Sequence, residues 1–368
     1  MSVGPVAIVG VGLMGGSLGL ALRDGDAVEV RGVDPDPEAL RVARAVGAIT
    51  DAAGSVEEAA EGAATVVLAA PVPEIAALAR RAVAAGGPDC LVTDLGSAKG
   101  AVVAALSPAE RERFIGGHPV CGAERTGVAF ARGSLFRGAT WFLTPAAEAR
   151  PDLFARLHGL VASVGARPVA IDAEVHDRLM ALVSHLPHVL AGALVNQAAA
   201  TAPAGREALR SAGPSFVDLT RVAGSNPPLW ADILIANRAA VLDELRAYLG
   251  RLEEVEAALA RGDRDWLLRF VGDAGEARTR LRTPADDGPA EPARVVVAVP
   301  NRPGVISEIA TALGHAHINI EDLSLRPGPP DGEGELVLLV DGPQAAEEAV
   351  RLIGAHGFTA QAGPASSA

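Results

Sequence analysis

His118 is the side chain in the first half of the sequence that is best suited to move a proton. It stands directly before a proline and after the apolar run Phe114–Gly117, and the segment HPVCGAER continues to the acid Glu124 and the base Arg125. An imidazole titrates near neutral pH and can act as a general acid or base. Such a segment is typical either of a polar turn after a strand or of a catalytic histidine. The elements around it must distinguish these two interpretations.

The N-terminal stretch VAIVGVGLMGGSLGL has the spacing of a dinucleotide-binding turn. Gly10, Gly12 and Gly15 form the pattern G-x-G-x-x-G between an apolar run and a helical pattern. The first glycine permits the tight turn, the second lets the backbone approach a pyrophosphate, and the third lets the helix pack on the strand. Asp34, at the end of the next apolar run, can accept hydrogen bonds from ribose hydroxyls and would repel a 2′-phosphate. The pattern favours NAD over NADP, and the alternative is a glycine-rich turn without a nucleotide.

Residues 1–172 alternate short apolar runs with helical patterns. The runs are 6–10, 28–34, 65–70, 90–96, 113–119, 140–144 and 168–172. This alternation predicts an α/β Rossmann-type domain, a mostly parallel sheet with helices on both faces. In such a sheet the ligand binds beyond the carboxyl ends of the strands, where the segments around Ala70, Ser97 and His118 are expected to meet. The residues expected to contact the cofactor are Gly10, Gly12, Leu13, Met14, Gly15, Asp34, Ala70 and Pro71.

From residue 173 the pattern changes to apolar residues at helical spacing. We expect an all-helical domain over 173–283 whose long apolar faces form a homodimer. Residues 284–293 are rich in proline and aspartate and are predicted to be a linker. Residues 294–364 follow the order strand, helix, strand, strand, helix, strand, which predicts a ferredoxin-like module.

The composition argues against several classes of function. A formal net charge of −13 and an aromatic content of 3% provide neither the basic surface nor the stacking platforms of nucleic-acid-binding proteins. No apolar run reaches the ~20 residues of a membrane span, and no signal peptide is expected. Two cysteines, Cys90 and Cys121, form no disulfide framework, so a cytoplasmic location is expected. Lys99 is the only lysine among 32 basic residues, and its role stays open.

Two segments of the helical region carry further reactive side chains. Ser184, His185 and His188 lie within about one helical turn. The spacing of the two histidines suits a metal, but no second ligand cluster accompanies them, so no metal is expected. Arg221 can hold a carboxylate with two parallel hydrogen bonds, and Trp230 follows it in DLTRVAGSNPPLW. The alternatives are hydrogen-bonded core histidines and an arginine in a surface or interface ion pair.

The chain resembles the prephenate dehydrogenase family over nearly its whole length. The resemblance rests on the glycine turn and on DLGSAK, HPVCGAE, SHLPHVLA and DLTRVAGSNPPLW. It implies NAD-dependent oxidative decarboxylation of prephenate to 4-hydroxyphenylpyruvate in L-tyrosine biosynthesis. It also implies that His118 hydrogen-bonds the substrate hydroxyl, that Ser97 assists it, and that Arg221 grips a carboxylate with Glu124 as a gate opposite. The residues implied to bind substrate are His188, Ser184, Arg221, Glu124 and Trp230.

The C-terminal module is similar to an ACT domain, which implies that it binds a small amino acid. L-Tyrosine is the expected effector, and an inert dimerisation module is the alternative. The residues implied to form the effector turn and the start of the second strand are Asn301, Pro303, Gly304, Val305, Asn319 and Ile320.

The segment HPVCGAE departs from the usual family pattern at Cys121 and Ala123, where an alanine and a hydroxyl residue are usual. The departure leaves the preference between prephenate and arogenate open, and an arogenate dehydrogenase is the leading alternative. A β-hydroxyacid dehydrogenase would share the first two domains but gives no reason for the C-terminal module. A non-catalytic NAD and amino-acid sensor would not need His118, Ser97 and Arg221 together.

Overall fold

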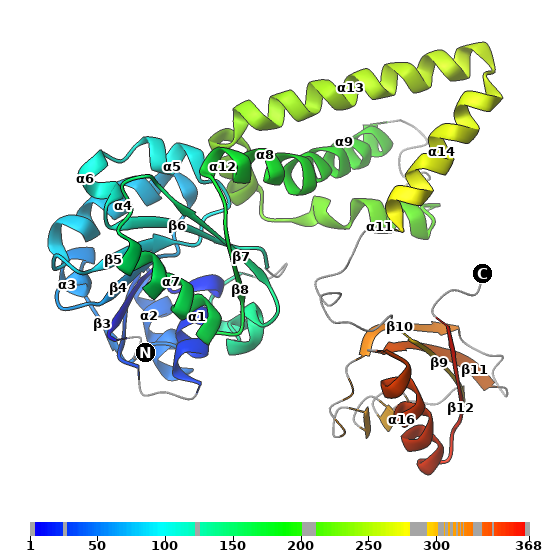
Figure 1. The fold of residues 1–368 in the computed structure, drawn as a ribbon, viewed down its shortest axis with the longest axis horizontal. Coiled ribbons are helices and arrows are strands. Elements are labelled where there is room, and N and C mark those ends of the chain that lie inside the picture. Colours follow the sequence, from blue (N-terminus) through cyan, green and yellow to red (C-terminus); the bar gives the residue numbers. More distant parts are fainter. Residues whose placement is uncertain are drawn as a thin grey trace. The chain divides into compact units, whose positions relative to one another are not determined.

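The computed structural model describes residues 4–24, 28–121, 126–200, 211–279, 293–300, 320–326, 333–340 and 342–364, with residues 305, 308, 309, 312, 313, 316 and 318. The chain forms two compact units, Met1–Gly275 and Glu276–Ala368 (Figure 1). The predicted parts 1–172 and 173–283 both contribute to the first unit, so their separation into two domains stays a prediction.

The first unit is built on an eight-stranded sheet with the order β3-β2-β1-β4-β5-β6-β7-β8. Neighbouring strands are parallel except β6 and β7, so the predicted mostly parallel sheet is confirmed. The edge strand β3 has only two residues and no apolar run, which is why the sequence pattern does not predict it. The strands are β1 Val6–Val9, β2 Val30–Val33, β3 Asp51–Ala52, β4 Thr65–Leu68, β5 Leu91–Asp94, β6 Phe114–Pro119, β7 Thr140–Pro145 and β8 Arg167–Ala170.

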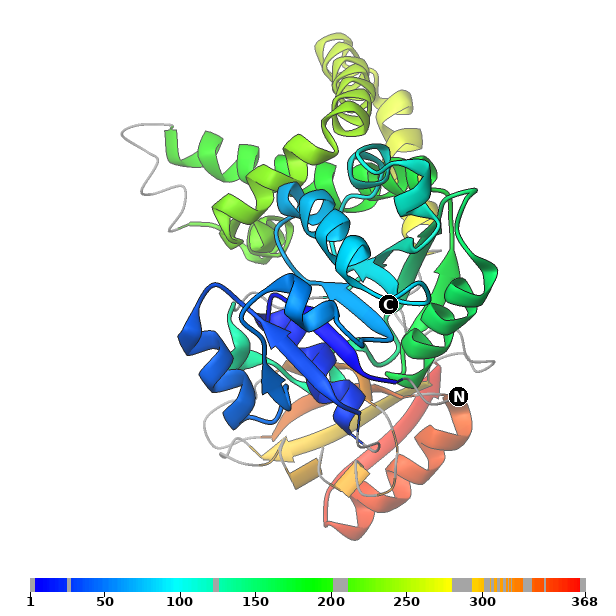
Figure 2. The same ribbon diagram turned by 90° about the vertical axis from the view of Figure 1, so that its left-hand side faces the viewer.

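Helices cover both faces of this sheet (Figures 1 and 2). Alternate residues of β1 point to opposite faces, with Val6 and Ile8 in one core and Ala7 and Val9 in the other. The first core is shared with α1 Leu13–Arg23, α2 Pro37–Ala45 and α7 Pro151–Ser163. The second is shared with α3 Val56–Ala60, α4 Val72–Ala85 and α5 Gly100–Ala104, and the short helix α6 spans Pro108–Arg111.

Beyond β8 the described part of the first unit is helical, as predicted. Helix α8, a π-helical turn and α9 form one continuous stretch of 28 residues, Ala173–Ala200. By length and composition alone this stretch could cross a membrane. It instead carries His176, Asp177 and His185, which are buried and hydrogen-bonded within the unit. The elements are α8 Ala173–Met180, the π turn Ala181–His185, α9 Leu186–Ala200, α11 Pro214–Thr220, the 3₁₀ turn Arg221–Gly224, α12 Pro227–Ala236, α13 Arg238–Arg261 and α14 Arg264–Arg278.

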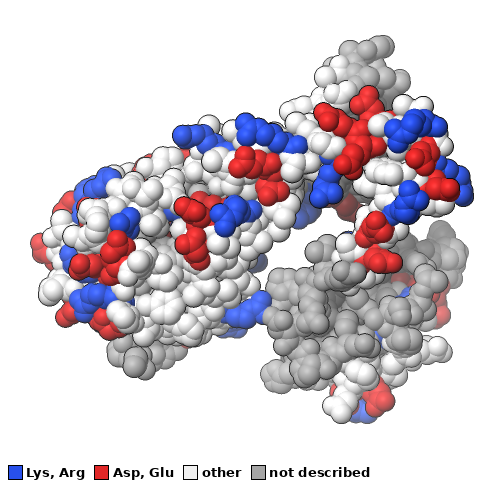
Figure 3. All heavy atoms as spheres, turned by 45° about the horizontal axis from the view of Figure 1, so that its top comes forward, with Lys and Arg blue, Asp and Glu red and all other residues white. Residues whose placement is uncertain are grey.

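Charged side chains of the first unit form short-range pairs at the surface. Arg81 donates to Glu57 from Nε and Nη2, at 2.7 and 2.8 Å, and Arg150 pairs with both Asp89 and Asp152. Figure 3 shows basic and acidic groups interspersed over the face turned to the viewer. No large region of a single charge sign is visible among the described residues on that face.

The second unit contains a four-stranded antiparallel sheet with the order β10-β11-β9-β12. This is the strand order of the ferredoxin-like module, and the predicted fold is confirmed. Its core joins alternate residues of β9, such as Val295 and Val297, to α16 through Ala349 and Ile353. The described residues 305, 308, 309, 312 and 313 are helical, at the position of the first predicted helix. The other elements are β9 Ala293–Pro300, β10 Ile320–Arg326, β11 Glu333–Val340, α16 Gly342–Ala355 and β12 Thr359–Pro364.

Candidate active site

The glycine turn between β1 and α1 is shaped by close backbone contacts. Gly10 has φ +91°, and a Cβ there would lie 2.3 Å from the carbonyl oxygen of Ala69. A Cβ on Gly15 would lie 1.9 Å from the carbonyl oxygen of Gly10, so only glycine lets the helix start this close to the strand. Gly12, the N-cap of α1, has no atom within 4 Å of a Cβ position. Its backbone is therefore open to a ligand at the positive end of the helix.

Asp34 follows β2 and is tied to the same turn. Its Oδ2 accepts a hydrogen bond from the backbone N–H of Val11 at 2.9 Å, and its Oδ1 accepts one from Asp36 at 2.9 Å. The open backbone at Gly12 and the carboxylate beside it fit the pyrophosphate and ribose of a dinucleotide.

A cavity of about 540 Å³ lies beside the glycine turn. Asn226, Pro228, Leu229 and Asp232, at the start of α12, line it together with the sheet loops. The cavity joins the carboxyl ends of β1, β4, β5 and β6, as the rule for parallel sheets predicts. The residues of the predicted site that line it are Gly12, Leu13, Met14, Ala70, Pro71, Ser97 and His118.

His118 occupies the end of β6, where two glycines make room for a buried ion pair. Lys99 is fully buried and pairs with Asp94, and its Nζ donates to the carbonyl oxygen of Gly117 at 2.9 Å. Asp94 also accepts from the backbone N–H of Gly117 at 3.0 Å. A Cβ on Gly116 would lie 2.3 Å from Thr144 Oγ1 and 3.1 Å from Lys99 Cδ. Lys99 therefore has a structural role, since it joins β5 and its following turn to the strand that carries His118.

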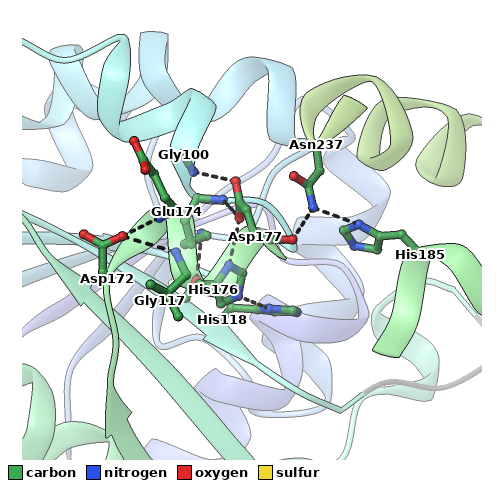
Figure 4. A network of polar contacts seen from close by, with 12 residues as sticks. Gly100, Gly117, His118, Asp172, Glu174, His176, Asp177, His185 and Asn237 are labelled. Atoms are coloured by element: carbon green, nitrogen blue, oxygen red, sulfur yellow. Dashed lines mark hydrogen bonds and ion pairs between the residues drawn. The ribbon is translucent and has the colours of Figure 1, made fainter. Parts of the chain in front are cut away.

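A network of polar contacts links His118 to α8 (Figure 4). His118 Nδ1 lies 2.8 Å from His176 Nε2, and His176 Nδ1 lies 2.8 Å from Asp177 Oδ1. Asp177 also accepts from the backbone N–H groups of Lys99 and Gly100, each at 2.8 Å. The catalytic histidine predicted from sequence is thus held by residues of the helical region.

Asn237 extends this network at the junction of α12 and α13. Its Nδ2 donates to the backbone carbonyl of Asp177 at 2.7 Å and lies 3.1 Å from His185 Nδ1 (Figure 4). Asn237 is buried, and the two contacts give its amide nitrogen hydrogen-bond partners. Burying that nitrogen without partners would cost free energy.

Burial dominates the electrostatics of the three histidines near the cavity. It lowers the pKa of His118 well below the ordinary value, and His176, Lys99 and His185 act in the same direction. Burial also lowers the pKa of His185 to about 4 and lowers the pKa of His188. Burial raises the pKa of Asp177, but hydrogen bonds from His176, Lys99 and Gly100 outweigh it, and its pKa is lowered. At neutral pH His118 is therefore an uncharged ring, able to accept a proton.

Several residues of this site lie outside the predicted set. His176, Asp177, Asn237 and Asp232 carry no motif, although the adjacent pair His176-Asp177 near the start of a helix is a signal that could have marked them. His118 and His176 are 58 residues apart in the chain, so only the fold brings them together.

The predicted substrate residues of the helical region form a second group. His188 stacks on Trp230, with ring centroids 3.5 Å apart, and Ser184 lies in the π turn before it. Arg221 is exposed at the start of the 3₁₀ turn Arg221–Gly224. None of these side chains is among those that line the cavity described above. Glu124 and Ala123 lie outside the described residues.

Cys121, the first departure from the expected HPVCGAE pattern, lines the cavity as a neutral thiol. Burial raises its pKa to about 11. Within the part of the chain that the structure describes, no three His, Cys, Asp or Glu side chains are grouped to hold a metal ion.

Of the predicted effector residues, two are described. Val305 is buried in the core of the second unit, and Ile320 begins β10. Asn301, Pro303, Gly304 and Asn319 lie outside the described residues.

Three family models match the chain in sequence order. The nucleotide-binding domain of prephenate dehydrogenase matches residues 18–170, and its dimerization domain matches residues 172–273. The ACT domain matches residues 293–357. A prephenate dehydrogenase of Bacillus subtilis is 32% identical over 326 residues, which are 87% of this chain and 87% of that protein.

Solved structures give the same result. A prephenate dehydrogenase from Aquifex aeolicus, in complex with hydroxyphenyl propionate and NAD⁺, has a TM-score of 0.72 and 30% identity and matches 77% of this chain and 99% of that chain. Synechocystis arogenate dehydrogenase has a TM-score of 0.66 and 26% identity, over 75% of this chain and 99% of that chain.

Proposed function

The chain belongs to the prephenate dehydrogenase family and is an NAD-dependent oxidoreductase, and we propose that it converts prephenate to 4-hydroxyphenylpyruvate in L-tyrosine biosynthesis. The observation that carries the proposal is that His118, Ser97 and the glycine turn line one cavity. A proton acceptor, a hydroxyl group and a dinucleotide-binding backbone are the parts that oxidation of a ring alcohol needs.

The residues of the cavity suit this chemistry. Prephenate has a ring carbon that bears both a hydrogen and a hydroxyl group, and a ring carboxylate that leaves as carbon dioxide. The bound nicotinamide supplies the hydride acceptor. His118 accepts the hydroxyl proton as the C–O bond gains carbonyl character, and returns it as the electrons of the leaving carboxylate make the ring aromatic. Ser97 assists by hydrogen-bonding the same oxygen.

The residues predicted for the dinucleotide are placed to hold it in this proposal. Gly12 and the N-terminus of α1 would receive the pyrophosphate, and Asp34 would accept from the ribose hydroxyls. Leu13, Met14, Ala70 and Pro71 line the cavity and would contact the cofactor there.

The helical region supplies the substrate's remaining contacts in this proposal. Arg221 pairs with a carboxylate, and Glu124 closes the pocket opposite it. Ser184, His188 and Trp230 form the wall around the side chain of the substrate. Arginine suits this role because its guanidinium binds a carboxylate through two parallel hydrogen bonds.

Arogenate is the second candidate substrate, and one observation favours it. Asp232 lines the cavity, and a carboxylate there would attract the ammonium group that distinguishes arogenate from prephenate. The test is to incubate the purified protein with NAD⁺ and either compound and follow NADH. Formation of NADH with prephenate supports the proposal. Formation of NADH with arogenate alone would make arogenate the substrate in place of prephenate. If neither compound yields NADH, both assignments are overturned.

The dimerization-domain match supports a homodimer formed through the helical region. Leu219, Ile235 and Val271 are 67%, 65% and 66% exposed in the single chain, which is high for aliphatic side chains unless a partner covers them. These side chains lie on α11, α12 and α14, and we propose that a second copy of the chain covers them, which sedimentation of the purified protein tests.

The ACT domain supports an amino-acid effector, and L-tyrosine, as the pathway product, is the proposed ligand. The residues proposed to bind it are Asn301, Pro303, Gly304, Val305, Asn319 and Ile320. The two described thiols, Cys90 and Cys121, are free, which supports a cytoplasmic location.

A further inference from the structure

We infer that His176 and Asp177 are positioning residues that fix the tautomer of His118, so that its Nδ1 carries the proton and its Nε2 carries the lone pair. The inference rests on the proposed role of His118 as proton acceptor. It concerns two residues that no sequence motif identifies and that belong to α8 rather than to the sheet loops (Figure 4).

The assignment of donors and acceptors in this network starts from Asp177. Its carboxylate accepts from two backbone N–H groups, those of Lys99 and Gly100, each at 2.8 Å. These donors and His176 keep the carboxylate ionised, with a lowered pKa. An ionised carboxylate only accepts hydrogen bonds, so Nδ1 of His176 carries the proton in the 2.8 Å contact with Oδ1.

The second step concerns the contact between the two buried rings, in which one nitrogen donates and the other accepts. A neutral ring with its proton on Nδ1 has a bare Nε2. The 2.8 Å contact then requires that His118 donate from its own Nδ1.

The third step concerns the reaction. Because Nδ1 of His118 is turned to His176, Nε2 is the ring nitrogen left for the substrate in the cavity that His118 lines. With its proton on Nδ1, His118 can accept the hydroxyl proton at Nε2. In the opposite tautomer Nε2 already carries a proton and cannot act as the base. When the ring becomes charged, Nδ1–H still donates to His176, which is backed by the Asp177 carboxylate.

The same contacts fix the position of the His118 ring. Asp177 is anchored to the backbone at the start of α5 and, through its own carbonyl oxygen, to Asn237. The groups that face His118 are His176 from α8, Lys99 from the loop before α5 and His185 from the π turn. Asp94 balances the charge of Lys99.

The test is Asp177→Asn in the full-length protein. An asparagine whose amide nitrogen replaces Oδ1 donates to His176 Nδ1, while the backbone N–H of Lys99 loses its acceptor. The His176 proton then moves to Nε2 and turns His118 into the wrong tautomer. The ¹⁵N shifts of His118, assigned with the His118→Asn variant, should change from the Nδ1–H to the Nε2–H pattern without cofactor or substrate. We expect kcat to fall roughly 100-fold or more, with little change in the Kd for NAD⁺.

Asp172→Asn is the matched control. Asp172 is the N-cap of the same helix and accepts from the backbone N–H groups of Glu174 and Val175, but its side chain does not contact His176. Asparagine caps a helix about as well as aspartate, so the His118 shifts and kcat should stay as in the wild type.

A second pair of variants serves if Asp177→Asn does not fold. His176→Gln can still donate to Asp177 and accept from His118, whereas His176→Leu can do neither. The glutamine variant should keep most of the activity that the leucine variant loses.

An Nε2–H pattern of His118 in the wild-type protein, or equal kcat in the two His176 variants, would overturn the inference. If the tautomer changes while kcat does not, the positioning role stands and His118 is not the base, which counts against the proposed function alone.

Discussion

The ring of His188 lies flat on the indole of Trp230, with centroids 3.5 Å apart and planes 7° apart. His185 meets the same indole edge-on, with centroids 6.1 Å apart. The contacts join the π turn and α9 to α12, whose first residues line the cavity beside the cofactor turn. Packing of the helical region is thereby coupled to the wall of the site.

His188→Ala removes this stack, which is worth about 0.5–1.5 kcal/mol. Because the stack holds α12 against α9, we expect KM for the substrate to rise roughly two- to tenfold, with the Kd for NAD⁺ unchanged. Steady-state kinetics and a cofactor titration measure the two effects. His188→Phe keeps a flat ring and should retain the stack, so its KM separates the effect of the stack from direct contact of the imidazole with the substrate. A KM equal to that of the wild type in His188→Ala would exclude a role for the stack.

The pH dependence of kcat/KM should reflect the lowered pKa of His118. The neutral ring is the active form, so activity is lost as the pH falls through the pKa of His118. Because burial and the neighbouring His176, Lys99 and His185 lower this pKa well below 6.5, the plateau should extend into mildly acidic solution. His118→Asn should lower the plateau roughly 100-fold or more and abolish the acidic limb. A wild-type limb centred at or above pH 6.5 would contradict this assignment.

Arg221→Ala should act on substrate binding rather than on the chemical step. Loss of a bidentate contact to a carboxylate is expected to raise KM roughly tenfold or more, with a smaller change in kcat. Arg221→Lys keeps the charge but not the geometry of two parallel hydrogen bonds, so its KM should lie between those of the wild type and Arg221→Ala. If Arg221→Ala leaves KM unaltered, the arginine does not touch the substrate.

Removal of the second unit tests the location of the effector site. A chain that ends after Thr279 keeps the described sheet and helices of the first unit. We expect its kcat to be retained and its inhibition by L-tyrosine to be lost, because the ACT match lies wholly beyond this point. Equal inhibition of the two chains would assign tyrosine to the catalytic pocket instead.

The parts of this site that follow local rules could be predicted from the sequence. Gly10 and Gly15 are dictated by a turn in which a Cβ would strike a carbonyl oxygen, and the sheet rule brings Ser97 and His118 to the same edge. These constraints act over short stretches and leave a pattern in the residue types.

The contacts made by Asp177 could not be predicted in this way. Its carboxylate binds the backbone of Lys99 and Gly100 across 78 and 77 residues of chain. A backbone N–H has no sequence signature, and His176 resembles any other histidine on a helix. The role of Lys99 could not be predicted for the same reason, because its contact with the carbonyl oxygen of Gly117 depends on the pairing of β5 with β6.

The complete burial of Lys99 also determines how the chain reacts with amine-directed reagents. Lys99 is the only lysine in the sequence and its side chain is shielded from solvent. A succinimidyl ester should therefore spare Lys99 in the folded protein and modify it only as urea opens the sheet, as mass spectrometry of the peptides would record. Rapid labelling of Lys99 in the native protein would contradict the burial. The single lysine of the chain therefore serves as a built-in reporter for the unfolding of the first unit.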